Sequence, residues 1–271
     1  MRTRLILLLL PLLILTGCQA VQTTEGGAVG VDRKQYMLGG PSSVEVNKMA
    51  AQSYAKILAE ARAKGVLNTD RQMLNRLRRI STHLIPEVTH FRPDARDWNW
   101  EVNLIKSEQI NAGVLPGGKI LFYTGIVDKL QLTDAEIAQI MGHEIAHALR
   151  EHGREASSRA GASQLALQIG SALLGLEGGT QQIAGAAVQY GVMMPHSRSN
   201  EAEADLIGLE LGARAGYKPE AAISLWQKMA SASGGGPPEF LSTHPSPGGR
   251  IEALRDAIPR VRPLYEASTK R

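Results

Sequence analysis

The sequence predicts an α+β domain that is mainly helical, with a small sheet placed before its central helix. Three observations predict this class. Apolar residues recur at helical spacing along most of the chain. Between residues 98 and 124 the pattern changes to that of strands around a Pro-Gly-Gly turn. The 43% hydrophobic and 21% charged residues are ordinary for a globular protein of 271 residues. We therefore expect one domain, residues 44–271.

The first residues have the pattern of a secretion signal. Two arginines precede the apolar run Leu5 to Leu15, which is too short to span a bilayer as a helix. The stretch Leu15-Thr16-Gly17-Cys18 resembles a bacterial lipobox, so we expect removal of residues 1–17 and a lipid on Cys18. An ordinary signal peptide cut after Ala20 is the alternative.

The next segment, residues 18–43, is polar and contains glycines, so we expect a flexible tether between lipid and domain. Gln19 after the cysteine resembles sorting to the outer membrane. Cys18 is the only cysteine, so no intramolecular disulfide can form. The chain carries no dense Lys/Arg stripe, and its aromatic residues make up only 4%, which argues against a nucleic-acid partner.

Helical spacing then predicts helices over residues 43–64 and 69–84, which we expect to back the central helix. Trp98 to Leu104 alternates as a strand does. Asn111 to Leu115 and Ile120 to Thr124 flank the Pro-Gly-Gly turn as a hairpin.

The pentapeptide His143-Glu144-Ile145-Ala146-His147 lies within the predicted central helix, which a Thr133-Asp134-Ala135-Glu136 capping box opens. At about 100° per residue, both imidazoles and the carboxylate share one face. This is the pattern of a zinc site with a general base beside it, because zinc polarises a carbonyl and lowers the pKa of a bound water. We predict that His143 and His147 bind zinc and that Glu144 is the base.

Catalytic zinc needs a third protein ligand. The metzincin pattern is excluded, because Arg150 and Gly153 stand where it has glycine and histidine. His152 would point about 180° away from His143 on a continuous helix, so we expect it to face solvent. A glutamate from a later segment is expected instead, and the candidates are Glu155, Glu177, Glu201, Glu203 and Glu210.

Glu201 is the strongest candidate because it opens a predicted helix. Asp205 follows one turn later on the same face, where it can orient a ligand. Glu203 would face about 200° away from Glu201, so only one of the two can ligate. The residues alone leave that choice open.

Several motifs in consistent order, over roughly residues 44–260, resemble the zinc metalloendopeptidases related to HtpX and the CAAX prenyl protease, and most of all the Oma-type, BepA-like and LoiP-like branch. The motifs are Asn111-Ala112, Leu115-Pro116-Gly117-Gly118, His143-Glu144-x-x-His147, Ser197-Arg198-x-x-Glu201-x-Glu203-Ala204-Asp205, Ser242-Thr243-His244-Pro245 and Arg250-Ile251. The resemblance implies a gluzincin-type domain with one Zn²⁺ per chain on His143, His147 and Glu201. It also implies Glu144 as catalytic base and Asp205, the family's second acidic position, as a second catalytic residue.

A sheet edge near the zinc can pair with an extended peptide, so we expect Asn111, Ala112 and Gly113 to bind substrate. A merely structural edge is the alternative. Relatives often carry an aromatic residue at the position of Gly113.

Two later segments have open interpretations. Residues 156–192, rich in small side chains, form either a packed helical hairpin, which we favour, or a mobile lid. His244 is either a turn residue or, as in BepA-like relatives, a regulatory fourth ligand that displaces the water.

Together these features predict a periplasmic zinc metalloendopeptidase, lipid-anchored to the outer membrane. Its expected substrates are misfolded or misassembled cell-envelope proteins. The alternatives are an assembly factor for outer-membrane proteins with a latent zinc site, and a non-catalytic structural zinc domain.

Overall fold

The computed structural model describes residues 19–37, 39–161, 197–232, 239–244 and 249–270. The sequence-predicted signal peptide, Cys18 and most of residues 156–192 lie outside them. The described elements are β1 Gln19–Val21, β2 Gln35–Met37, α2 Ser43–Ala63, α3 Arg71–Leu84, the 3-10 turns Ile85–His90 and Pro93–Asp97, β3 Glu101–Ile105, β4 Ala112–Leu115, β5 Lys119–Tyr123, α4 Thr124–Leu130, α5 Asp134–Leu149, α8 Arg198–Arg214, α9 Ala221–Ser231, α10 Glu239–Thr243 and α11 Arg250–Ser268.

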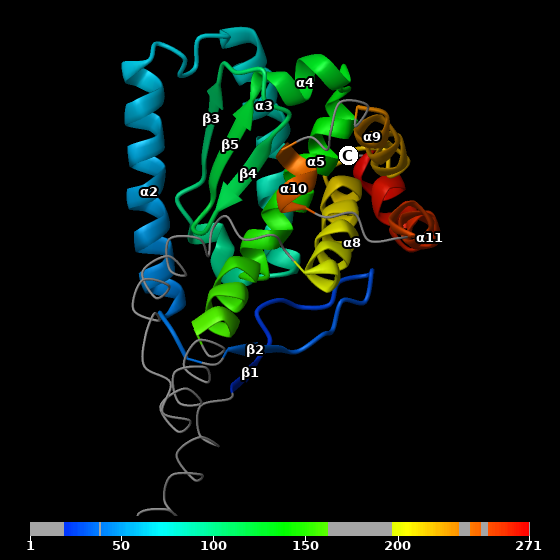
Figure 1. The fold of residues 1–271 in the computed structure, drawn as a ribbon. Coiled ribbons are helices and arrows are strands. Elements are labelled where there is room, and N and C mark those ends of the chain that lie inside the picture. Colours follow the sequence, from blue (N-terminus) through cyan, green and yellow to red (C-terminus); the bar gives the residue numbers. More distant parts are fainter. Residues whose placement is uncertain (1–18, 38, 162–196, 233–238, 245–248, 271) are drawn as a thin grey trace, which may run out of the picture.

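The architecture is α+β and mainly helical, as predicted (Figure 1). A three-stranded sheet has the order β3-β5-β4, with β3 parallel and β4 antiparallel to β5. The expected hairpin is β4–β5, and its turn uses Gly117 and Gly118 at positive φ. The ring of Trp100 packs against Gly118, where an added Cβ would lie 2.7 Å from it. Among the described helices, none combines the length and hydrophobicity that crossing a membrane requires.

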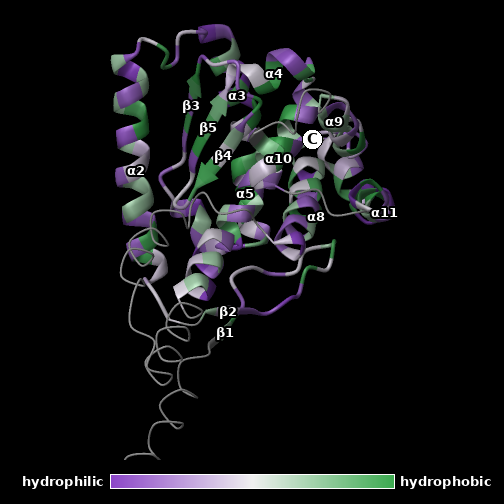
Figure 2. Ribbon diagram, viewed as in Figure 1, coloured by the Kyte–Doolittle hydropathy of each residue, from purple (hydrophilic) through white to green (hydrophobic). Residues whose placement is uncertain are grey.

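Alternation along β5 gives the sheet two buried faces. Ile120 and Phe122 join the main core with α3 and α5, whereas Leu121 faces the smaller cluster that includes Tyr54 of α2. Figure 2 shows the hydrophobic residues along β4 and β5. The expectation that both early helices back the central helix is thus half wrong: α3 contacts α5, but α2 packs on the other face of the sheet. Its Tyr54 hydroxyl donates to the Ile120 carbonyl oxygen at 2.8 Å.

The central helix α5 begins at the predicted capping box and is almost entirely buried. Thr133 Oγ1 accepts from the Glu136 N–H, and the Glu136 carboxylate accepts from the Thr133 N–H at 2.8 Å. Against it packs α8, whose N-cap is Ser197. The two helices cross where Gly142 meets Gly208: a Cβ on Gly208 would lie 2.6 Å from the His143 nitrogen. This close approach brings the side chains of α5 and α8 to one place.

The segment expected as a flexible tether is instead folded against the domain from residue 19 to residue 37. Strands β1 and β2 pair antiparallel, and Val29, Val31 and Met37 are buried. The Val29 N–H donates to the buried Glu210 carboxylate at 2.9 Å. A polar composition did not reveal this, because the segment is fixed by a few long-range polar contacts rather than by a periodic apolar face.

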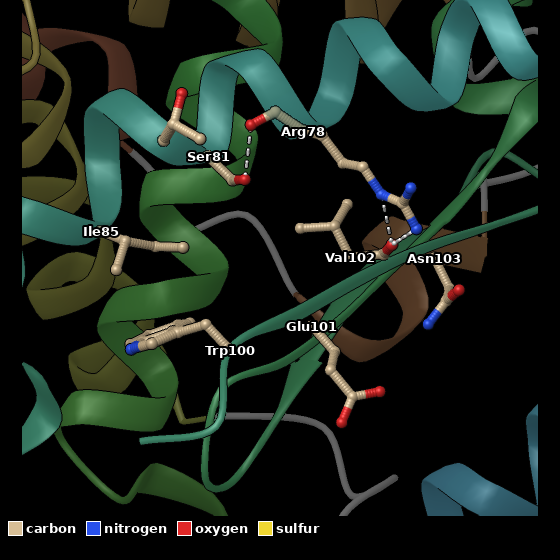
Figure 3. Close-up of a pocket in the computed structure, with 8 residues that line it drawn as sticks. Arg78, Ser81, Ile85, Trp100, Glu101, Val102 and Asn103 are labelled. Atoms are coloured by element: carbon tan, nitrogen blue, oxygen red, sulfur yellow. Dashed lines mark hydrogen bonds between the residues drawn. The ribbon is translucent and has the colours of Figure 1, made fainter. Parts of the chain in front are cut away.

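Sheet edges differ in whether they are covered. The outer edge of β3 is closed, because the Asn68 N–H donates to the Leu104 carbonyl at 2.7 Å and Arg78 donates to the Val102 carbonyl at 3.4 Å. Figure 3 shows Arg78 reaching from α3 to Val102 beside a cavity of about 490 Å³. None of the candidate zinc ligands lines that cavity. The other outer edge belongs to β4.

Candidate metal centre

The structure brings four predicted residues together. His143 and His147 come from α5, Glu201 from the first turn of α8, and His244 directly follows α10; all four are buried. One potential ligand atom from each lies within 4.8 Å of the others. The Nε2 atoms of the α5 histidines are 3.1 Å apart, and the Glu201 oxygens lie 3.3 Å from His147 Nε2 and 3.5 Å from His143 Nε2. These four atoms therefore converge on one point.

Glu201 and Glu203 have separate environments, as their predicted facing requires. Glu201 is fully buried in the histidine cluster. Burial would raise its pKa, but hydrogen bonds from His143 and His147 hold that pKa well below its usual range, so Glu201 is a carboxylate. Glu203 points to the other side, where it pairs with Arg150 and Arg33.

Glu144 lies beside this cluster, next to β4. Its Oε1 is 3.3 Å from His244 Nε2. Burial, followed by the charge of Glu201, raises the pKa of Glu144 to about 8, against the opposing effects of His143 and of a hydrogen bond from the Val114 N–H. A carboxyl group whose pKa is raised from its ordinary value toward neutral pH can both take up and return a proton, which is the property that a general base and acid requires.

Asp205 lies behind the cluster rather than within it. Its Oδ1 is 2.9 Å from His143 Nδ1 and its Oδ2 is 2.5 Å from Arg250 Nε. Burial alone would lower the pKa of His143, but the hydrogen bonds with Asp205 and Glu201 raise it to about 9. Asp205 thus fixes the ring so that Nε2 faces Glu201, and positive charge is favoured at this point.

His152 contradicts the prediction of a solvent-facing side chain. It is fully buried, and its Nδ1 is 2.8 Å from His147 Nδ1. The prediction assumed a continuous helix, but α5 ends at Leu149 and Glu151 has φ of +51°. That turn redirects the chain and places His152 against His147. Burial, despite the nearby Glu203, lowers the pKa of His152, which favours its neutral ring.

Arg250, at the start of α11, is a functional candidate to which the sequence assigned no role. Its Nη2 donates to Glu201 at 2.7 Å, and its guanidinium stacks 3.7 Å from the Trp226 ring centroid. The side chain is buried, so its charge faces two carboxylates directly. The sequence showed a motif that contains Arg250. However, arginine side chains are usually exposed, and the residues next to Arg250 in the sequence do not indicate that this one is buried.

The predicted substrate residues lie at or beside β4, whose outer edge pairs with no other strand among the described residues. The Tyr123 N–H donates to the Asn111 carbonyl, so Asn111 and Gly113 direct their main-chain groups toward β5. Ala112 and Val114 therefore direct theirs outward. Val114 was not among the predicted substrate residues, because the hydrogen-bonding register could not be read from the sequence.

The donor set fits zinc. Two neutral imidazoles and a carboxylate are the ligands of a common class of catalytic zinc site. The Nδ1 atoms of His143 and His147 are engaged by Asp205 and His152, which leaves both Nε2 atoms for a cation. His244 supplies a fourth donor.

The pattern of Peptidase family M48 matches residues 72–258. The chain belongs to this family. Membership places it among the metallopeptidases and, with the donor set, confirms zinc as the metal expected from the sequence. It also confirms the resemblance on which the ligand set was based.

The relatives of this M48 chain are also named as proteases. It is 35% identical to the mitochondrial metalloendopeptidase OMA1 of Schizosaccharomyces pombe over 64% of this chain and 50% of the relative. With the human OMA1 it shares 35% identity over 70% of this chain and 38% of the relative. With the beta-barrel assembly-enhancing protease of Escherichia coli it shares 28% identity over 62% of this chain and 36% of the relative. The chain thus spans half or less of the length of these relatives.

Proposed function

We propose that this M48 chain is a zinc endopeptidase that cleaves extended segments of cell-envelope proteins. The observation that carries the proposal is the buried cluster of His143, His147 and Glu201, with Glu144 beside it and hydrogen-bonded to the Val114 N–H of the edge strand β4. In this proposal the first three bind zinc and Glu144 is the base. The relatives named metalloendopeptidase OMA1 and beta-barrel assembly-enhancing protease support endopeptidase activity, and the second name supports a role in the assembly of β-barrel proteins.

The chain's residues divide the work of hydrolysis. When bound, zinc supplies a Lewis acid for the substrate carbonyl and lowers the pKa of an attacking water. Glu144 takes a proton from the water and returns it to the leaving amine nitrogen. Asp205 holds His143, and Arg250 holds Glu201 and Asp205. Asp205 is accordingly a positioning residue in this mechanism.

Substrate is proposed to lie along β4. The main-chain groups of Ala112 and Val114 face away from β5, and pairing with an extended peptide would replace the hydrogen bonds that their N–H groups now make to Asn111 Oδ1, at 2.9 Å, and to Glu144. Asn111 and Gly113 keep the strand in register with β5. Binding through main-chain groups depends little on substrate sequence, so unfolded segments are preferred. This supports damaged or misassembled envelope proteins as substrates.

The proposed location is the periplasmic side of the outer membrane, with a lipid on Cys18. The support for it is the lipobox-like sequence before Cys18 and the beta-barrel assembly named in the bacterial relatives. Labelling cells with a clickable fatty acid, with Cys18→Ser as control, tests it: label on the variant as strong as on wild type would rule out this anchor.

The first prediction concerns Glu144. Purified full chain should degrade casein, and Glu144→Gln should lower the rate by roughly 10²- to 10⁴-fold because the base is lost. Zinc content, measured by atomic absorption, should stay near one per chain in both proteins. Cleavage that survives Glu144→Gln would rule out this mechanism.

Chelation separates the remaining alternatives. Removing zinc should abolish casein cleavage while circular dichroism keeps its helical signal. Unfolding on chelation would instead indicate a structural zinc domain. A chain that holds zinc and stays folded, but cleaves nothing even as His244→Ala, would indicate an assembly factor.

A further inference from the structure

The environment of His147 extends well beyond the proposed zinc ligands. His147 Nδ1 lies 2.8 Å from His152 Nδ1, and His152 Nε2 lies 3.2 Å from Glu203 Oε2. We call these three residues the relay. All three are buried, and none is exposed by more than 9%. Its far end is a carboxylate, as in the carboxylate–histidine–metal arrangements of many zinc proteins, but with a second imidazole inserted.

Hydrogen positions along the relay follow from the chemistry of ligation. A histidine that offers Nε2 to a cation carries its proton on Nδ1. His147 Nδ1–H must then donate to His152 Nδ1, which accepts. The proton of His152 is left on Nε2, where it donates to Glu203. One arrangement of protons therefore satisfies every nitrogen of both rings.

Two arginines fix the carboxylate end of the relay. Arg150, fully buried, donates to Glu203 from Nε at 2.8 Å. Arg33 of the folded N-terminal segment donates to Glu203 as well, and to Glu155 at 2.8 and 2.9 Å. Arg150 also donates to the Arg33 carbonyl oxygen at 2.8 Å. The N-terminal segment thus reaches the support of a proposed zinc ligand.

We propose that His152 and Glu203 are positioning residues for zinc ligand His147, and that Arg33 ties the segment 19–37 into this support. The inference rests on the proposed ligand role of His147. It gives the metal two separate supports: Asp205 for His143, and the relay for His147.

Substitutions at His152 test the relay through zinc affinity, measured with a competing chromophoric chelator on the purified full chain. His152→Leu keeps the volume but has no polar atom, and should weaken zinc binding by about 10- to 100-fold. His152→Gln has an acceptor for His147 and a donor for Glu203, so it should recover most of that loss. Arg33→Met should weaken binding less than His152→Leu.

Cobalt substitution gives a measurement that separates loss of the His147–His152 hydrogen bond from a general disturbance of packing. The ring N–H protons of cobalt-bound histidines give shifted, exchangeable NMR signals. In wild type both His143 and His147 should give signals that exchange slowly, because both partners are buried. His152→Leu should speed exchange of the His147 signal alone, whereas Asp205→Asn should affect the His143 signal.

Three results would overturn the relay. They are zinc affinity of His152→Leu within twofold of wild type, equal losses in His152→Leu and His152→Gln, and fast exchange of the His147 signal in wild type. The last needs no variant, so the test holds even if His152→Leu does not fold. If wild type itself binds no zinc, or if His147→Ala binds it normally, the proposed function fails rather than the relay.

Discussion

At the residue scale, a ring nitrogen of His244 lies within 4.8 Å of one potential ligand atom from each of His143, His147 and Glu201, so in the proposed mechanism it competes with the attacking water for the metal. Its Nδ1 lies 3.1 Å from the Phe240 carbonyl, which fixes a proton there and turns the lone pair of Nε2 toward the cluster. Its ring also stacks on Phe240, 4.4 Å between centroids. These contacts favour the interpretation of His244 as a fourth ligand over that of a turn residue.

His244→Ala should therefore raise peptidase activity. If His244 is away from the metal in about a tenth of the wild-type molecules, the activity should rise about tenfold, because apparent activity scales with the fraction of molecules that can bind the attacking water. Initial rates of casein cleavage at saturating zinc measure it, with the exposed neighbour Ser242→Ala as control. Equal rates in wild type and His244→Ala would leave the switch without support.

Residue-scale prediction from sequence worked where the determinants are local. The spacing within His143-Glu144-x-x-His147 needs only a helix, and the Thr133 capping box sits at the start of that helix. His152 failed because its position depends on Glu151, whose positive φ is stabilised by Arg92 at 2.8 Å, far away in sequence. Buried Arg250 was invisible for the same reason: its partners come from another helix.

At the element scale, the crossing of α5 and α8 decides the geometry of the metal centre. Each helix contributes proposed ligands, and the two helices approach backbone to backbone at Gly142 and Gly208. A Cβ on Gly208 would meet main-chain atoms of α5 at 2.6 to 2.9 Å, which no side-chain rotation can relieve. The sequence predicted both helices. It could not predict their crossing point, because a glycine within a helix does not indicate which other helix packs against it.

Gly208→Ala should for this reason destabilise the protein, although alanine normally stabilises a helix by about 1 kcal/mol relative to glycine. We expect a net loss of roughly 1 to 3 kcal/mol from overpacking. Zinc affinity should fall with it, because Glu201 moves away from His143. Thermal unfolding and chelator competition measure the two effects.

The matched control is Gly161→Ala, in the helix after α5, where a Cβ would meet nothing within 4 Å. Its melting temperature should be unchanged or higher. A Gly208→Ala protein as stable as Gly161→Ala would show that the helices can separate without cost.

At the scale of the whole molecule, the N-terminal segment is held by charge as well as by the burial of Val29, Val31 and Met37. Arg33 lies between Glu155 and Glu203, and Gln35 donates to the Arg150 carbonyl at 2.5 Å. Burial raises the pKa of Glu155, but hydrogen bonds from Arg33 and Gln35 outweigh it and lower that pKa overall. The attachment of this segment should therefore depend on pH.

The sign follows from the lowered pKa of Glu155. Its contribution to folding is complete above the unfolded value of about 4.3 and is lost as the pH falls below it. Arg33→Met should lower the free energy of unfolding by about 1 to 2 kcal/mol at pH 7, a modest loss because Arg33 is partly exposed. Below pH 4 the loss should become progressively smaller. Urea unfolding at pH 7 and pH 3 measures this difference.

Arg159→Met provides the control, because Arg159 also donates to Glu155, at 2.6 Å, but from a more exposed position four residues along the chain. It should cost less than about 0.5 kcal/mol at either pH. A pH-independent effect of Arg33→Met would mean that packing, not charge, holds the segment.

If a lipid on Cys18 holds the chain, as proposed, the docked segment also limits how far the domain can move from the membrane. A flexible stretch of the length of residues 18–43 would let a membrane-held domain wander roughly 25 to 30 Å from its attachment point. Because β1 begins at Gln19 and pairs with β2, a molecule held at residue 18 has almost no slack. The active site then stays within a thin layer at the bilayer surface. Its substrates would be proteins whose unfolded segments lie in that layer.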